Sequence, residues 1–148
     1  MLGRLTTWLR LLGFDTLYPK YAKDLELVFL SAKENRILLT RDRGLVKRKD
    51  LQRYMLIESN DWKKQLKEVL KEFNLYKYVK EEKEFLTICP LCNERLQDIP
   101  STQAISWVPH YVYCTNNKFS MCPSCDRIYW KGTHIEKIKS TLESILKE

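Results

Sequence analysis

Histidine and glycine are scarce in this chain, and it has no long apolar run. Only two histidines occur among 148 residues, so neither a Ser-His-Asp nor a Cys-His catalytic arrangement competes with other interpretations. No apolar stretch approaches the roughly 18 residues of a membrane span, and the N-terminus lacks the cleavage pattern of a secretory signal. The composition, with 44% hydrophobic and 30% charged residues, is typical of a soluble globular protein. We therefore expect a cytoplasmic location, where thiols stay reduced.

Cysteine carries the most specific chemical signal. Four of the five cysteines form two Cys-x-x-Cys motifs, Cys89-Pro90-Leu91-Cys92 and Cys122-Pro123-Ser124-Cys125. This spacing directs two thiolates at one ion, and two such pairs complete a tetrahedral structural zinc site. The motifs predict a zinc ribbon in which Cys89, Cys92, Cys122 and Cys125 bind Zn²⁺. Two disulfides or a redox dithiol are the alternative, which a reducing compartment disfavours.

The 29 residues between the two motifs exceed the usual spacing of about 15 to 20, so this loop needs turns and strands of its own. We predict strands at residues 111–113, 119–121 and 127–130, followed by a C-terminal helix with an apolar face. The fifth cysteine, Cys114, is expected to be a buried small apolar residue. His110 and His134 are expected to pack or donate hydrogen bonds, because four cysteines already satisfy zinc.

The first half of the chain alternates between helical and strand patterns. Helices are predicted at residues 1–12, closed by Gly13, at 24–35, capped by Asp24, and from Trp62 onward. Strands are predicted at residues 14–18, 37–39 and 54–57. This order indicates an α/β domain with a mostly parallel sheet. We expect this domain to span residues 1–76, a strand or docked linker to span 77–84, and the zinc ribbon with its C-terminal helix to span 85–148.

The positive charge is concentrated in the first half. The net charge is +7, and residues 1–76 hold 16 Lys and Arg against 10 Asp and Glu, whereas residues 77–148 hold 10 against 9. A polyanion should therefore bind the first half. The densest basic cluster suits a phosphate backbone and consists of Arg41, Arg43, Lys47, Arg48, Lys49 and Arg53. The alternative is a solvated surface with no partner.

Acidic residues follow the ends of the predicted parallel strands, where ligands bind in open α/β sheets. Asp42 and Asp61 lie just beyond two of these strands, and Asp24 begins the second helix. Carboxylates gathered at one sheet edge suit Mg²⁺ or Mn²⁺, which could orient a water for attack on a phosphodiester. The alternative for each acid is helix capping, because Asp is among the preferred N-cap residues.

Several segments together resemble the Mut-seven C-terminal RNase domain family, whose members look like PIN-type nucleases with an appended zinc ribbon. Besides the two Cys-x-x-Cys motifs, the matching segments are Leu2-Gly3-Arg4-Leu5, Trp8-Leu9-Arg10-Leu11-Leu12-Gly13-Phe14-Asp15, Arg36-Ile37-Leu38-Leu39-Thr40-Arg41-Asp42 and Arg127-Ile128-Tyr129-Trp130-Lys131-Gly132-Thr133-His134. They run over nearly the whole chain. Their combination is more specific than any one of them.

The resemblance implies a PIN-like domain whose acids bind a divalent metal ion and cleave RNA. Asp42 falls on the family's acid in the Thr-Arg-Asp motif, Asp24 on the acid that opens the second helix, and Asp15 on a recurrent Asp. Family members usually have an apolar strand ending in a metal-binding Asp before the Met-Leu-Gly segment, whereas this sequence starts at Met1 within that segment. Two explanations are open: the start codon is assigned too late, or the protein lacks this strand and its carboxylate. In the second case we expect lower metal affinity and nuclease activity, with RNA binding retained.

Three functional hypotheses follow. The first is a metal-dependent ribonuclease in which Asp24 and Asp42 hold Mg²⁺ or Mn²⁺ and the basic cluster binds RNA. The second is an RNA- or ribosome-binding protein with weak or no catalysis, which uses the basic surface and the zinc ribbon. It predicts salt-sensitive binding without metal-dependent turnover. The third, a protein-interaction module working through the ribbon and the C-terminal helix, predicts binding that salt does not affect.

Overall fold

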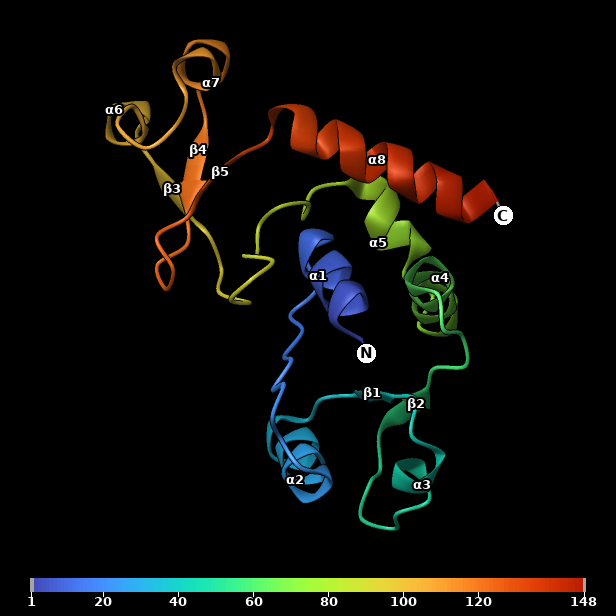
Figure 1. The fold of residues 1–148 in the computed structure, drawn as a ribbon. Coiled ribbons are helices and arrows are strands. Elements are labelled where there is room, and N and C mark those ends of the chain that lie inside the picture. The colour runs from blue at the N-terminus through green and yellow to red at the C-terminus, as the bar shows by residue number, and fades with distance from the viewer. Residues whose placement is uncertain (1, 148) are drawn as a thin grey trace.

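The structure is a computed structural model that describes residues 2–147. Its first elements form a small α/β unit (Figure 1): α1 (Gly3–Leu11), α2 (Asp24–Glu34), β1 (Leu38–Thr40), α3 (Arg43–Val46), β2 (Tyr54–Leu56), α4 (Trp62–Glu72) and α5 (Tyr76–Glu81). The remaining elements are β3 (Gln97–Ile99), α6 (Ser101–Ala104), α7 (His110–Thr115), β4 (Phe119–Met121), β5 (Ile128–Trp130) and α8 (Gly132–Lys147). The mixed α/β fold class with a ribbon and a C-terminal helix is thereby confirmed.

The α/β unit is built on two short parallel strands. β1 and β2 pair in register, with Leu39 opposite Met55. Successive side chains of a strand point to opposite faces of the sheet. Leu39 and Met55 accordingly pack against the core that contains α1 and α4, whereas Leu38 packs against Val28 of α2 on the other face. The sheet therefore lies between these two helical layers (Figure 1).

The main hydrophobic core draws on both ends of the chain. α1 contacts α4, and α4 contacts α8, so the first and last helices lie on the same central helix (Figure 1). The apolar faces at helical spacing that the sequence predicts for these helices supply most of this core. Its buried members are Leu5, Leu9, Leu12, Ile57, Leu66, Val69, Leu70, Val79, Phe85, Ile138, Leu142 and Ile145.

The ribbon is a three-stranded antiparallel sheet in the order β3, β4, β5. Its own small core contains Ala104, Val112 and Phe119, so the long loop between the cysteine motifs folds back over the sheet. The predicted strands at 119–121 and 127–130 are confirmed as β4 and β5, because alternating apolar side chains there face this core.

Two predicted strands are wrong. Residues 14–18 follow Gly13, whose φ is +98°, and form no strand, because side chains bond the backbone of Thr16: its amide donates to Asn93 and its carbonyl accepts from Arg10. Residues 111–113 lie in α7 instead. A helical turn after Pro109 buries Val112 alone, which explains the alternating apolar pattern without a strand.

Three further expectations are corrected. Residues 77–84 contain much of helix α5 rather than a strand, with Val79 buried in the main core. Cys114 is exposed rather than buried, because α7 presents only Val112 to the ribbon core, and its Sγ lies 3.4 Å from His110 Nε2. Asp24 is the first residue of α2 and makes no capping hydrogen bond, since Lys23 occupies the N-cap position.

Candidate metal centre and acidic site

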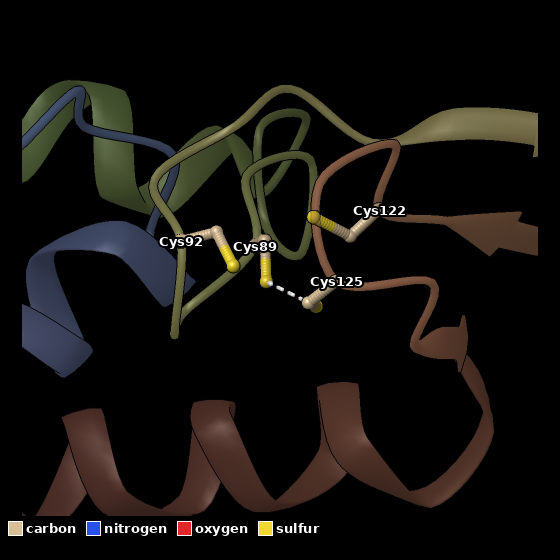
Figure 2. Close-up of side chains that lie close together, drawn as sticks. All are labelled: Cys89, Cys92, Cys122 and Cys125. Atoms are coloured by element: carbon tan, nitrogen blue, oxygen red, sulfur yellow. Dashed lines mark hydrogen bonds between the residues drawn. The ribbon is translucent and has the colours of Figure 1, made fainter.

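The four motif cysteines converge on one point. Their Sγ atoms all lie within 4.8 Å of one another (Figure 2), and the Sγ atoms of Cys89 and Cys125 are 3.9 Å apart. A tetrahedral zinc site with zinc–sulfur bonds of about 2.3 Å places its sulfurs about 3.8 Å apart. The cysteines are free thiols rather than disulfides. The donor set and its spacing therefore fit a structural zinc ion.

The two cysteine motifs form loops with the same backbone. In the first metal loop, residues 89–94, the amide of Asn93 donates to the carbonyl of Cys89 at 2.9 Å. In the second metal loop, residues 122–127, the amide of Asp126 donates to the carbonyl of Cys122 at 2.9 Å. Asn93 and Asp126 have φ values of +64° and +62°, a conformation that Asn and Asp tolerate better than most residues. Each loop thus needs a short polar residue after its second cysteine.

The surroundings of Cys89 favour its thiolate. Burial alone would raise its pKa, but hydrogen bonds from the Tyr129 hydroxyl, 3.3 Å away, and from the backbone of Leu91 and Cys92 lower the pKa to about 7. Burial, hydrogen bonding with Cys125 and the charge of Cys89 raise the pKa of Cys92 to about 12. Because metal ligands must be thiolates, binding an ion releases protons from the site.

Arg10 of α1 holds the first metal loop against the α/β unit. Its side chain is 8% exposed, and its guanidinium donates to the carbonyls of Pro90 at 3.1 Å, Leu91 at 3.3 Å and Thr16 at 2.8 Å. Burial lowers the pKa of Arg10, whereas the charges of the nearby thiolates act to raise it. A buried cation with three carbonyl partners also offsets part of the negative charge of a four-thiolate site.

Asp15 and Asn93 make a second connection between the two parts. The Asp15 carboxylate accepts from Asn93 Nδ2 at 2.7 Å and from Arg36 at 3.0 Å, and Asn93 Oδ1 accepts from the Thr16 amide at 2.8 Å. The hydrogen bond from Arg36 lowers the pKa of Asp15. The Asp of the Leu-Gly-Phe-Asp segment therefore attaches the first metal loop to the end of α2.

Sequence reasoning missed Arg10 and Asn93. No pattern within α1 shows that the metal loop covers Arg10. A signal for Asn93 does exist, since Asn and Asp stand at the same position after each cysteine pair and both tolerate positive φ.

Asp42 lies where β1 ends and caps α3. Its Oδ1 accepts from the amides of Gly44 at 2.8 Å and Leu45 at 3.2 Å. The capping alternative is thus realised, but both bonds use one oxygen, and among residues 2–147 no hydrogen bond involves Oδ2. The cap fixes the carboxylate at the sheet edge and leaves one oxygen toward solvent. Asp42 can therefore cap the helix and bind a cation at once.

The other predicted acids are exposed. The charge of Asp24 helps to raise the pKa of Arg48, after the hydrogen bond and charge of Asp50, which places Asp24 near the turn after α3. Asp61 precedes α4 without a capping side-chain bond. Within the described part of the chain, the four cysteines are the group of three or more metal-binding side chains close enough to share an ion. Asp24 and Asp42 stay predictions.

The predicted basic cluster surrounds this edge but is partly paired. Lys47 and Lys49 are exposed, and the Nε atom of Arg41 is buried without a hydrogen-bond partner among the described residues. Three arginines bond neighbouring groups: Arg43 with Glu58 at 3.1 Å, Arg48 with Asp50 at 2.9 Å and Arg53 with the Asn35 side chain at 2.9 Å. Exposed pairs of this kind are weak and can exchange a carboxylate for a phosphate.

Comparison with models of protein families shows to which family the chain is related. A model of the Mut7-C RNAse domain matches residues 1–142. The chain belongs to the Mut7-C RNAse domain family. Comparison with curated proteins and with solved structures found no match in either set. In residues 2–147 no helix has the length and apolar character to cross a membrane.

Membership in this family supports a nuclease-like function and the binding of RNA. It covers both the α/β unit and the metal loops. The expected resemblance is thereby confirmed, and the zinc interpretation gains independent support from the cysteine geometry.

Proposed function

We propose that the chain is a divalent-metal-dependent ribonuclease. The match to the Mut7-C RNAse domain over residues 1–142 carries this proposal. Asp42 supports it, because its capped carboxylate stands at the carboxyl end of β1 with one oxygen directed away from the cap. Asp24 would be the second carboxylate, and the basic cluster would hold the phosphates.

The roles of the chain's own groups follow from charge. Asp42 and Asp24 would hold Mg²⁺ or Mn²⁺, which when bound supplies an activated water and charge stabilisation at phosphate. Lys47 and Lys49 attract the RNA backbone, and Arg41 adds positive charge beside them. Contacts of this kind are independent of base sequence. We propose a cytoplasmic setting, consistent with reduced thiols at the zinc centre.

A Mn²⁺-dependent RNA cleavage assay with Asp42→Asn tests the proposal. Asn is as good an N-cap as Asp, so the substitution keeps α3 in place while it removes the charge. Loss of a direct ligand should reduce cleavage by at least about 100-fold, since even removal of a group behind a ligand costs 10–100-fold. Asp98→Asn is the matched control, because Asp98 is an exposed acid of β3 in the ribbon, and it should cleave like the wild type.

Equal cleavage by the wild type and Asp42→Asn would remove Asp42 from the mechanism. A non-catalytic RNA- or ribosome-binding function is the second candidate. It is favoured by one observation, that within residues 2–147 no three carboxylates come close enough to share an ion. That function predicts RNA binding with a steep salt dependence and no turnover with Mn²⁺ in any variant.

A further inference from the structure

Unpaired positive charge of the α/β unit lies on α4 and α1 as well as in the cluster after β1. The ion pairs of the described residues involve Arg36, Arg43, Arg48, Lys83 and Lys139. None of these pairs includes a lysine of α4 or Arg4 of α1. We call these cations the basic stripe, which consists of Arg4, Lys63, Lys64, Lys67 and Lys71.

The lysines of the basic stripe occupy one side of α4. At about 100° per residue, all four fall within an arc of about 100°. The buried Gln65 and Val69 lie on the opposite side of the helix. Lys63, Lys67 and Lys71 follow one another at four-residue steps, which separates them by about 6 Å each along the helix axis. An extended polyanion can therefore contact them in succession.

Trp62 orders the start of the basic stripe. Its ring stacks on Trp8 with a centroid separation of 5.2 Å and an interplanar angle of 19°. The Arg4 guanidinium lies 5.2 Å from the centroid of the Trp62 ring, and Lys63 Nζ lies 5.7 Å from it. These cation–π contacts hold two cations from different helices side by side. The stripe thus continues from α4 onto α1.

Helix α4 is connected to the edge of the sheet where Asp42 lies. Glu68 of α4 accepts from the amides of Glu58 at 3.0 Å and Ser59 at 2.9 Å, just after β2. Glu58 in turn pairs with Arg43, the residue after Asp42. Hydrogen bonds and an ion pair therefore connect α4 to the candidate acidic site. A strand lying on the stripe would lead to that site.

We propose that the basic stripe binds the phosphates of single-stranded RNA and directs the strand to the edge of the sheet that carries Asp42. This inference rests on the proposed function, in which RNA is the substrate. It adds α4 and α1 to the RNA-binding surface, beside the cluster at residues 41–53 that the sequence predicts. Lysine contacts with phosphate carry no base specificity, so the stripe accepts any sequence.

Binding of a labelled oligouridylate, measured by fluorescence anisotropy at several salt concentrations without added Mg²⁺ or Mn²⁺, tests the proposal. The stripe variant is Lys63→Gln, Lys67→Gln and Lys71→Gln together. Each lost contact with a single strand reduces the slope of log affinity against log salt by about 0.7, so three reduce it by about 2. From 50 to 200 mM salt, the wild type should then lose about 20-fold more affinity than the variant.

The matched control removes three exposed lysines elsewhere, Lys118→Gln, Lys131→Gln and Lys137→Gln. It should keep the wild-type slope. A stripe variant with the wild-type slope, or a control with an equally reduced slope, overturns the inference and leaves the ribonuclease proposal standing. A wild type that fails to bind the oligouridylate overturns the stripe as an RNA site, whereas the Mn²⁺ cleavage assay decides the proposed function separately.

Discussion

The two metal loops share a backbone but differ in what surrounds them. The first metal loop receives hydrogen bonds from Arg10 and gives and accepts others through Asn93, so it is attached to the α/β unit at several points. The second metal loop lies between β4 and β5, and among the described residues no hydrogen bond joins it to the α/β unit. Both loops therefore have the same cysteine motif, but only the first metal loop connects the ribbon to the α/β unit through side-chain hydrogen bonds.

Of the changes considered, loss of the metal ion that the two loops share should destabilise the protein most. Cys122→Ser removes one of four thiolates, so we expect zinc content to fall well below one ion per chain and the melting temperature to drop, because metal binding free energy is also folding free energy. Zinc released on denaturation and thermal unfolding measure these effects. Cys114→Ser is the control, since Cys114 lies outside the site, and it should match the wild type. Full zinc content in Cys122→Ser would contradict a four-cysteine site.

Loss of the hydrogen bonds between Arg10 and the first metal loop should destabilise the protein less than loss of the metal ion. Arg10→Met keeps much of the side-chain volume but leaves the half-buried carbonyls of Pro90 and Thr16 without their donor, which should lower the free energy of unfolding by about 2 kcal/mol. Arg127→Met makes the equivalent change beside the second metal loop, where Arg127 is exposed, and should cost less than about 0.5 kcal/mol. Urea unfolding of zinc-loaded protein measures both. Equal costs would contradict the asymmetry between the loops.

The smallest expected effect is a difference in stability between two alanine variants, one in each metal loop. It separates the strain of the positive φ from the hydrogen bonds that Asn93 makes to the α/β unit. Asn93→Ala and Asp126→Ala each place alanine at positive φ, which costs about 1–2 kcal/mol in either loop. Only Asn93→Ala also removes the bonds to Thr16 and Asp15, so it should be the more destabilising variant by about 1 kcal/mol. The same urea titration resolves this difference. If Asp126→Ala were the more destabilising variant, the hydrogen bonds of Asn93 would not contribute to attaching the first metal loop to the α/β unit.

The features that sequence predicts well here depend on local spacing. Two cysteine pairs, the apolar strands β1 and β2 and the amphipathic helices α4 and α8 each follow from residues within a few positions of one another. The ribbon strands β4 and β5 follow in the same way. Of the two wrong strands, residues 111–113 form a local helical turn, whereas residues 14–18 have partners far away in the chain.

Residues 14–18 illustrate the limit. Their alternating pattern is typical of a strand, but Asn93, which lies 77 positions from Thr16, supplies the hydrogen bond that a neighbouring strand would otherwise make. Arg10 likewise is buried by a loop 80 positions away. Only the tertiary structure could show that a residue on the polar side of α1 contacts the metal loop. At the acidic site, sequence predicts the place of Asp42 at the end of β1 but not the use of a single oxygen for the cap.

The position of α8 in the main core has a consequence for synthesis of the chain. Leu5 and Leu9 of α1 are synthesised well before Leu142 and Ile145, with which they share a core. Before α8 is synthesised, the apolar faces of α1 and α4 are only partly buried. A nascent chain that lacks α8 therefore exposes a hydrophobic surface. Such intermediates are substrates for chaperones and prone to aggregation.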